Sequence, residues 1–194
     1  NTLSKTGVQP KWEDCWAAVR DEYVRTGELV SLIPPFVKFG QTCRMWKEYV
    51  TTHSPQFEVY FTNILRYWLF ETYLTGKADI FEFGCGSGWS LPIMAQMYPT
   101  RKIHGLDWSR ASVDIVTALK RHGGYNVEGH WFDMYTPDDK LVIPTGSQVF
   151  TLGSMEQMGS GFRPFVDFLI KKRVGRVCHV EAVSEFYDPA NLLD

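Results

Sequence analysis

The most distinctive chemistry in the chain belongs to a glycine-rich segment with the sequence EFGCGSG at residues 82–88. Glycines allow backbone conformations that other residues resist, and they let the chain approach a ligand closely. The amides of such a turn, with the start of the next helix, suit an electron-rich ligand group. A dinucleotide fingerprint G-x-G-x-x-G from Gly84 needs a small residue at position 89, where this chain has Trp89. A phosphate-binding P-loop is excluded because no Gly-Lys-Ser/Thr follows.

A single carboxylate follows this segment at a distance that suits a nucleoside. Asp107 stands 19 residues after Gly88, in the sequence GLDWS, where the second predicted strand ends. An acid at that place can accept hydrogen bonds from both hydroxyls of a ribose. The alternative role for Asp107 is to cap the helix that follows. Trp108 is placed either to lie against an adenine ring or simply to pack in the core.

Hydrophobic periodicity changes near residue 77 and divides the chain into two predicted parts. Residues 1–77 are predicted to form a helical N-terminal extension, helical throughout, and residues 78–194 one α/β domain. Strands are expected at 78–83, 102–106, 127–132, 148–152 and 176–183, and helices at 90–98, 112–121 and 162–172. This alternation predicts a mostly parallel sheet with helices on both faces, and ligands at the carboxyl ends of the strands.

Together these motifs resemble those of the class I S-adenosylmethionine-dependent methyltransferases, which have a Rossmann-like fold. The shared pattern is E-x-G-x-G-x-G after the first strand and an acid at the end of the second; it continues in FDM at 132–134 and FTLGS at 150–154. The resemblance implies S-adenosylmethionine as the cofactor, with Glu82 toward the methionine amino group, Asp107 on the ribose and Asp133 near the adenine amine. The implied cofactor-binding residues are Glu82, Gly84, Cys85, Gly86, Gly88, Asp107, Trp108, Asp133, Met134 and Leu152. For Asp133 the alternative is an acid that begins a surface turn.

Methyl transfer from a sulfonium needs mainly alignment and exclusion of water, and a hydroxyl acceptor also needs a general base. Candidate bases follow the fourth and fifth strands, namely Glu156, His179 and Glu181. His179 and Glu181 lie on one face of an extended strand and could act as a pair. The alternative is that they are polar residues satisfied beneath a loop. A lid over the acceptor is predicted from aromatic residues of the extension, namely Tyr60, Trp68 and the segment 36–39.

We expect a small-molecule acceptor, and more specifically a hydroxyl of a sugar or natural product. This expectation rests on a looser resemblance to bacterial methyltransferases of such pathways. Two alternatives remain. A catalytically inactive methyltransferase-like scaffold need not keep Glu82 and Asp107, and a nucleotide-binding oxidoreductase is disfavoured by Trp89.

Composition limits the other partners that the chain is expected to have. The net charge is −2 and no basic block occurs, so no nucleic-acid partner is expected. No apolar stretch approaches membrane-spanning length, so no membrane association is expected. The 4 scattered cysteines indicate reduced thiols of a cytoplasmic protein. The 5 histidines show no metal-ligand spacing, so no bound metal is expected.

The C-terminal region leaves one edge of the predicted sheet uncovered. The resembled family has two further strands after the fifth, whereas this sequence ends soon after it, in a run at 190–193 that looks like the beginning of a helix. An uncovered edge strand is a liability. We therefore expect further chain segments, an oligomer partner or the helical extension to cover the fifth-strand edge.

Overall fold

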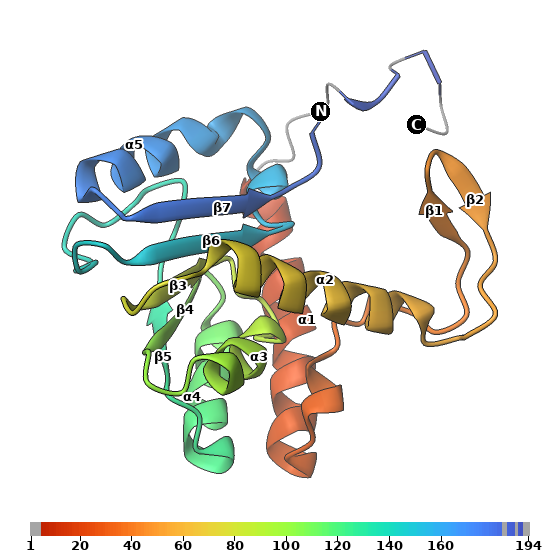
Figure 1. The fold of residues 1–194 in the computed structure, drawn as a ribbon, viewed down its shortest axis with the longest axis horizontal. Helices are drawn as coiled ribbons and strands as arrows, with labels where there is room; N and C mark the ends of the chain where they lie inside the picture. Colours follow the sequence, from red (N-terminus) through yellow and green to blue (C-terminus); the bar gives the residue numbers. More distant parts are fainter. Residues whose placement is uncertain (1–4, 184–185, 189, 192–194) are drawn as a thin grey trace.

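The structure is a computed structural model that describes residues 5–183, 186–188 and 190–191. At its centre lies a sheet with the strand order β5-β4-β3-β6-β7, in which every neighbouring pair is parallel (Figure 1). Its strands are β3 (Ile80–Phe83), β4 (Ile103–Asp107), β5 (Val127–Trp131), β6 (Gln148–Leu152) and β7 (Arg176–Val180). The chain runs outward from β3 through β4 and β5, then returns to the other side of β3. Such a reversal opens a crevice at the carboxyl ends of the central strands.

Helices cover both faces of this sheet, as the alternation of elements predicted. The helices of this part are α3 (Ser90–Met97), α4 (Arg110–Gly123) and α5 (Arg163–Lys172), with a 3-10 segment η2 at Met155–Phe162. α5 packs on one face, where Phe83, Phe165 and Phe168 belong to an aromatic cluster. α3 and α4 cover the other face, where Ile80 and Ile115 are fully buried. The predicted α/β, Rossmann-like fold is therefore confirmed.

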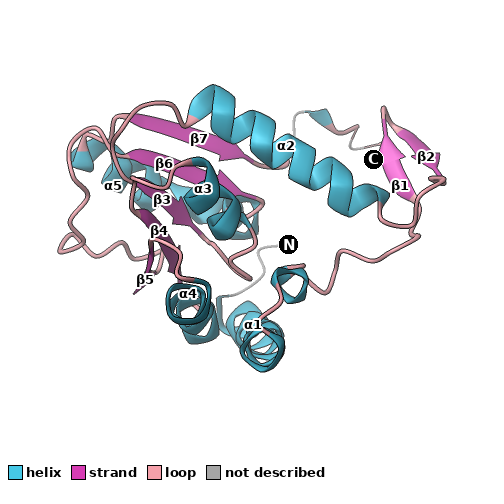
Figure 2. Ribbon diagram, turned by 60° about the horizontal axis from the view of Figure 1, so that its bottom comes forward, coloured by secondary structure: helices cyan, strands magenta, loops and turns pink. Residues whose placement is uncertain are grey.

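The N-terminal extension is not helical throughout, and that prediction is wrong. It contains α1 (Lys5–Thr26), a 3-10 turn η1 (Leu29–Leu32), an antiparallel hairpin of β1 (Cys43–Met45) and β2 (Glu48–Val50), and α2 (Phe57–Tyr73). The hairpin turns at Trp46 and Lys47, which have φ angles of 54° and 68°. Turns with positive φ at both positions usually carry Asn-Gly or Asp-Gly, so the sequence lacks the ordinary hairpin signal. Figure 2 shows the hairpin beyond the end of α2 that lies away from the central sheet.

The extension shares a hydrophobic core with the rest of the chain. Trp16 and Tyr23 of α1 are buried in the same cluster as side chains of β3 and α4. The Glu13 carboxylate accepts hydrogen bonds from the Arg110 and Ala111 amides at 2.8 and 3.0 Å. It thereby satisfies two amides at the N-terminus of α4, which otherwise lack partners within the helix. α1 therefore packs on α4 through both apolar and polar contacts. The domain boundary near residue 77 stays a prediction.

β7 forms one edge of the sheet, and no described strand pairs with its outer side. Beyond it, Ala190 lies in a turn rather than in a helix. Residues 192–194, which complete the run predicted to begin a helix, lie outside the described residues. The expectation that something covers this edge therefore stays a prediction. None of the described helices is long and apolar enough to cross a membrane.

Candidate functional site

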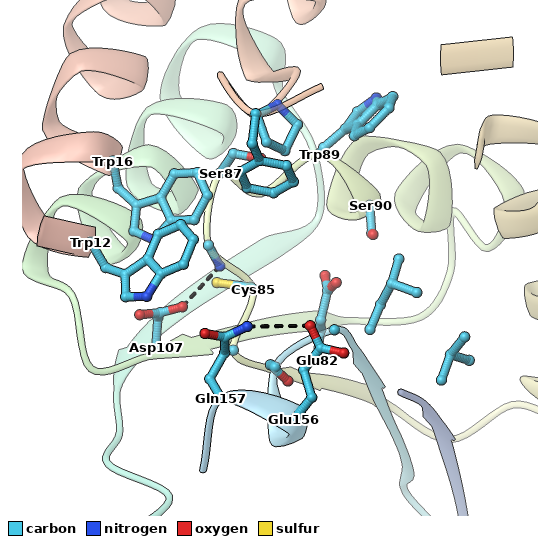
Figure 3. A pocket seen from close by; sticks show the side chains of 18 of the residues that line it. Trp12, Trp16, Glu82, Cys85, Ser87, Trp89, Ser90, Asp107, Glu156 and Gln157 are labelled. Carbon is cyan, nitrogen blue, oxygen red and sulfur yellow. Dashed lines mark hydrogen bonds between the residues drawn. The ribbon is translucent and has the colours of Figure 1, made fainter. Parts of the chain in front are cut away.

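A pocket of about 550 Å³ opens at the carboxyl ends of β3, β4 and β6, where the strand order reverses (Figure 3). One wall is the glycine-rich turn after β3, flanked by Asp107 at the end of β4 and by the segment 152–158 after β6. α1 and α2 of the extension supply another wall through Trp12, Trp16 and Arg66. The pocket therefore lies where the fold class predicted a ligand, and both parts of the chain form it.

The glycine-rich turn adopts a backbone conformation that favours glycine. Gly84, Gly86 and Gly88 have φ angles of 71°, 50° and 70°. At Gly86 a side chain would also lack space, because an added Cβ would lie 2.9 Å from the Trp16 indole. α1 therefore closes directly over the turn, and this approach requires glycine at position 86.

Asp107 is buried, and both of its carboxylate oxygens hold the turn in place. Oδ2 accepts a hydrogen bond from the Gly86 amide at 2.9 Å, and Oδ1 accepts one from the Ser109 amide at 2.8 Å. Burial raises the pKa of Asp107 to about 6, although these two amides oppose the shift. The cap of α4 is Ser109 rather than Asp107, since the Ser109 hydroxyl accepts from the Ser112 amide at 3.2 Å. Each Asp107 oxygen has a second lone pair, so the carboxylate can still accept two ligand hydroxyls.

Glu82 and Arg66 are buried in the pocket and interact electrostatically. Burial raises the pKa of Glu82 to about 8 and lowers the pKa of Arg66 to about 10, and the opposite charge of each partner opposes both shifts. Arg66 Nε donates to Ser90 Oγ at 3.1 Å, and its guanidinium lies 3.9 Å from the centroid of the Trp89 ring. Glu82 Oε2 and Arg66 Nη1 are buried without a hydrogen-bond partner among the described residues. Buried polar atoms are usually paired, so these two atoms indicate a place for polar ligand groups.

Aromatic rings line two sides of the pocket. Trp12 and Trp16 stack with ring centroids 5.2 Å apart, and Phe36 packs edge-on against both. On the side of β4, Trp108 stacks on Tyr135 at 5.9 Å. The ionisable side chains that line the pocket are mostly carboxyl groups, namely those of Glu58, Glu82, Asp107 and Glu156, against the guanidinium of Arg66. Aromatic faces and carboxylates together suit a flat ligand that also carries positive charge.

Comparisons with known proteins bear on the fold that carries this pocket. No protein-family model matches the chain. It is 24% identical over 140 residues to protein-L-isoaspartate O-methyltransferase of Desulfotalea psychrophila, a match that covers 66% of this chain and 62% of that protein. Similar solved structures include the [4+2]-cyclase SpnF (TM-score 0.57, 16% identity, 91% of this chain and 63% of that one). Coclaurine N-methyltransferase, solved with N-methylheliamine and SAH, has a TM-score of 0.54 at 14% identity, over 90% of this chain and 51% of that one.

The chain has the class I S-adenosylmethionine-dependent methyltransferase fold. It spans less than two thirds of the length of each of these three relatives. One of the structures that share this methyltransferase fold is named a cyclase, so the fold by itself does not specify the reaction. The reaction depends on the side chains that line the pocket.

The methyltransferase fold brings most of the predicted cofactor-binding residues to the pocket. Those that line it are Glu82, Gly84, Cys85, Gly86, Asp107, Trp108, Met134 and Leu152. Gly88 is not among them, because it faces Ile115 and Leu119 of α4.

Asp133 does not line the pocket, so the structure gives no support to its predicted contact with adenine. Its Oδ1 accepts from the Tyr135 amide at 2.9 Å, and its Oδ2 accepts from the Thr136 hydroxyl at 3.0 Å. The carboxylate therefore holds its own turn, which was the alternative reading of this residue. Its neighbour Met134 reaches the pocket instead.

Glu156 is the one predicted base whose side chain lines the pocket. Its Oε2 accepts from the Ala182 amide at 3.1 Å, and its Oε1 accepts from Gln157 Nε2 at 3.2 Å (Figure 3). Glu181 lies outside the pocket lining and supports this segment, since its Oε2 accepts from the Glu156 amide at 3.1 Å. Glu181 therefore positions the chain around Glu156.

His179 does not line the pocket, so the structure gives no support to the predicted catalytic pair of His179 with Glu181. Its Nδ1 shares a hydrogen bond with the Thr151 hydroxyl at 2.8 Å, and its ring contacts Phe165 of α5. The neighbouring Val180 lines the pocket, and successive residues of a strand point to opposite faces. His179 therefore points to the face of β7 opposite Val180, and Glu181 lies beyond the end of that strand.

Only part of the predicted lid lies at the pocket. Phe36 lines the pocket, whereas Tyr60 and Trp68 do not and are more than half exposed, at 56% and 53%. The sequence did not predict Arg66 as a pocket residue. The feature that could have indicated it is a cation on the apolar face of α2, seven residues after the buried Val59.

Proposed function

We propose that the chain binds S-adenosylmethionine in this pocket and transfers its methyl group to a small-molecule acceptor. The observation that carries the proposal is that the glycine-rich turn, Glu82 and Asp107 line one pocket. Two buried polar atoms there, Glu82 Oε2 and Arg66 Nη1, have no hydrogen-bond partner among the described residues. When bound, the cofactor supplies a methyl group on a positively charged sulfur. The residues of the chain bind it, orient it and exclude water.

The methionine end of the cofactor has a natural place between Glu82 and Arg66. A free amino acid carries an ammonium and a carboxylate. Glu82 Oε2 is an acceptor for the ammonium once the ligand's positive charge has favoured loss of the Glu82 proton, and Arg66 Nη1 is a donor for the carboxylate. Such charge-assisted hydrogen bonds are stronger than neutral ones. The residues present therefore fit the group that the fold implies.

The nucleoside end fits the other half of the pocket. Asp107 retains lone pairs for the two ribose hydroxyls, and the rings of Trp12, Trp16 and Trp108 offer flat surfaces for a base or an acceptor. The acidic lining favours a ligand with net positive charge, which S-adenosylmethionine has and its demethylated product lacks. Product release is favoured by the same difference in charge.

We propose Glu156 as the group that would remove a proton from a hydroxyl acceptor. It lines the pocket from the segment after β6, and each of its oxygens has a free lone pair beside the bond that it accepts. The acceptor is proposed to be a hydroxyl of a sugar or natural product, as the sequence indicated. An amine acceptor needs only to arrive neutral and would make Glu156 dispensable.

Isothermal titration calorimetry with S-adenosylmethionine and its demethylated product tests the proposal. The wild type should bind both, and Asp107→Ala should lose about 2–4 kcal/mol of binding free energy through its ribose bonds. Asp133→Ala is the matched control, because Asp133 is also buried and holds a turn but does not line the pocket. It should bind as the wild type does. Equal affinities in all three folded proteins would overturn the assignment.

The same titrations separate the alternatives. An oxidoreductase would bind NAD instead, and a scaffold domain would bind the cofactor without any turnover when candidate acceptors are supplied. We expect no NAD binding, because Trp89 occupies the position where the dinucleotide fingerprint needs a small residue.

A further inference from the structure

Two histidines that are distant in sequence meet near the edge strand β5, outside the pocket. His104 of β4 is in register with Glu128 of β5, and His130 follows Glu128 by two residues on the same face. His104 also lies beside Phe81 of β3, with ring centroids 4.1 Å apart and ring planes 8° apart. The side chains of His104, Glu128 and His130 therefore lie on the same face of the sheet as Phe81, which belongs to the core cluster that α5 helps to form.

Their polar atoms converge on one point. His104 Nδ1 is 2.9 Å from His130 Nε2, and His130 Nε2 is 3.9 Å from Glu128 Oε1. One ligand atom from each of the three residues lies within 4.8 Å of the other two. A zinc ion with bonds of about 2.0–2.2 Å holds its ligand atoms roughly 3.4 Å apart. Small movements of Glu128 and His130, which are less buried than His104, would complete that geometry.

Two neighbouring charges hold the cluster in this orientation. Lys102 Nζ binds the other oxygen of Glu128, Oε2, at 3.1 Å and leaves Oε1 directed at the histidines. The Asp79 carboxylate lies 3.6 Å from His104 Nε2, which is buried and has no hydrogen-bond partner among the described residues. Metal-binding histidines usually donate a hydrogen bond from their second nitrogen to a carboxylate, and a small approach of Asp79 would form that bond here. The cluster thus has the surroundings of a metal site as well as its ligands.

We propose that His104, Glu128 and His130 bind a divalent transition-metal ion of the Zn²⁺ type, with solvent at the fourth position. Two imidazoles and a carboxylate are a recognised zinc ligand set. None of the three lines the pocket, and the ion would join β4 to the edge strand β5. Its expected role is to stabilise that edge.

Calorimetric titration of Zn²⁺ into the tag-free chain tests this, with thermal unfolding measured in parallel. We expect about one ion per chain and a rise in Tm with zinc concentration, since a ligand that binds the folded state stabilises it. His130→Ala and Glu128→Gln should each weaken binding at least about 10-fold, as loss of even an outer-shell partner commonly does. His122→Ala is the matched control, because His122 is an exposed histidine in the last turn of α4. It should bind zinc as the wild type does.

Cobalt reports the ligand type independently of affinity. Co²⁺ bound to the cluster should give visible d–d bands without the ultraviolet charge-transfer band of a thiolate ligand. A thiolate band would move the site to a cysteine and overturn the proposal. So would an absence of zinc binding by the wild type, or zinc affinity that His130→Ala and Glu128→Gln leave unchanged.

Discussion

Glu82 and Arg66 illustrate, at the scale of single residues, what the sequence could and could not reveal. Glu82 was predicted because it directly precedes the glycine-rich turn, and local spacing carries that information. Arg66 comes from α2, 16 residues earlier, and only tertiary packing brings it to the turn. Asp133 is the opposite case, because local spacing matched the family motif but did not predict the role of the residue. Its carboxylate holds its own turn.

The raised pKa of Glu82 predicts how stability depends on pH. The folded chain holds this proton up to about pH 8, whereas an exposed glutamate loses it near 4.5. The protonated group therefore adds stability that is full below about pH 4.5 and is lost as the pH rises through 8. Asp107, with a pKa of about 6, acts in the same sense, and the histidines with lowered pKa act in the opposite one.

Comparison of the wild type with Glu82→Gln isolates the contribution of Glu82. The glutamine cannot titrate, so the wild type should lose stability relative to the variant as the pH rises from about 5 to about 8. Chemical denaturation of the ligand-free proteins across this range measures the difference. A difference that stays constant, or that changes in favour of the wild type, would show that Glu82 is not held protonated.

Arg66 is predicted to recognise the methionine end of the ligand and not its nucleoside. Arg66→Met keeps an unbranched apolar stem but removes the donors, and should cost about 1.5–3 kcal/mol of affinity for S-adenosylhomocysteine. The affinity for adenosine, which has no methionine part, should stay the same. Equal losses for both ligands would indicate general disruption of the pocket instead.

At the scale of elements, periodicity predicted the five strands of the sheet and the helices between them. It failed in the extension, where the hairpin of β1 and β2 turns at Trp46 and Lys47 and carries no turn-forming residues. It could not predict the capping of α4 by Glu13, because the two lie 97 residues apart in sequence. Contacts of this kind depend on how α1 docks, and no local pattern encodes them.

The contact between α1 and the glycine-rich turn can be tested by comparing the stability of two glycine-to-alanine variants. Gly86→Ala and Gly146→Ala both place a side chain at positive φ, which costs about 1–2 kcal/mol. Gly146 has open space around it, whereas a Cβ at Gly86 meets Trp16. Gly86→Ala should therefore destabilise the chain more, and Trp16→Ala in the same chain should remove that extra loss. Equal losses in the two single variants would mean that α1 does not close on the turn.

At the scale of the whole molecule, the extension and the sheet form one core and one pocket. The sequence predicted residues 1–77 to be a helical extension with a lid over the acceptor, whereas Trp16 and Tyr23 are buried in a core shared with the sheet. The cluster of His104, Glu128 and His130 was not predicted for a related reason, since His104 and His130 are 26 residues apart and meet only through the pairing of β4 with β5. Spacing along the chain cannot show residues that strand register brings together.

A crystal structure of the chain with S-adenosylhomocysteine tests the central claim most directly. The account predicts density for the ligand in the pocket between the glycine-rich turn and α1. Its ammonium should lie on Glu82, its carboxylate on Arg66 and its ribose hydroxyls on Asp107, each within hydrogen-bond distance. A pocket that stays free of ligand at saturating concentration, or a ligand whose ribose lies away from Asp107, would contradict the account.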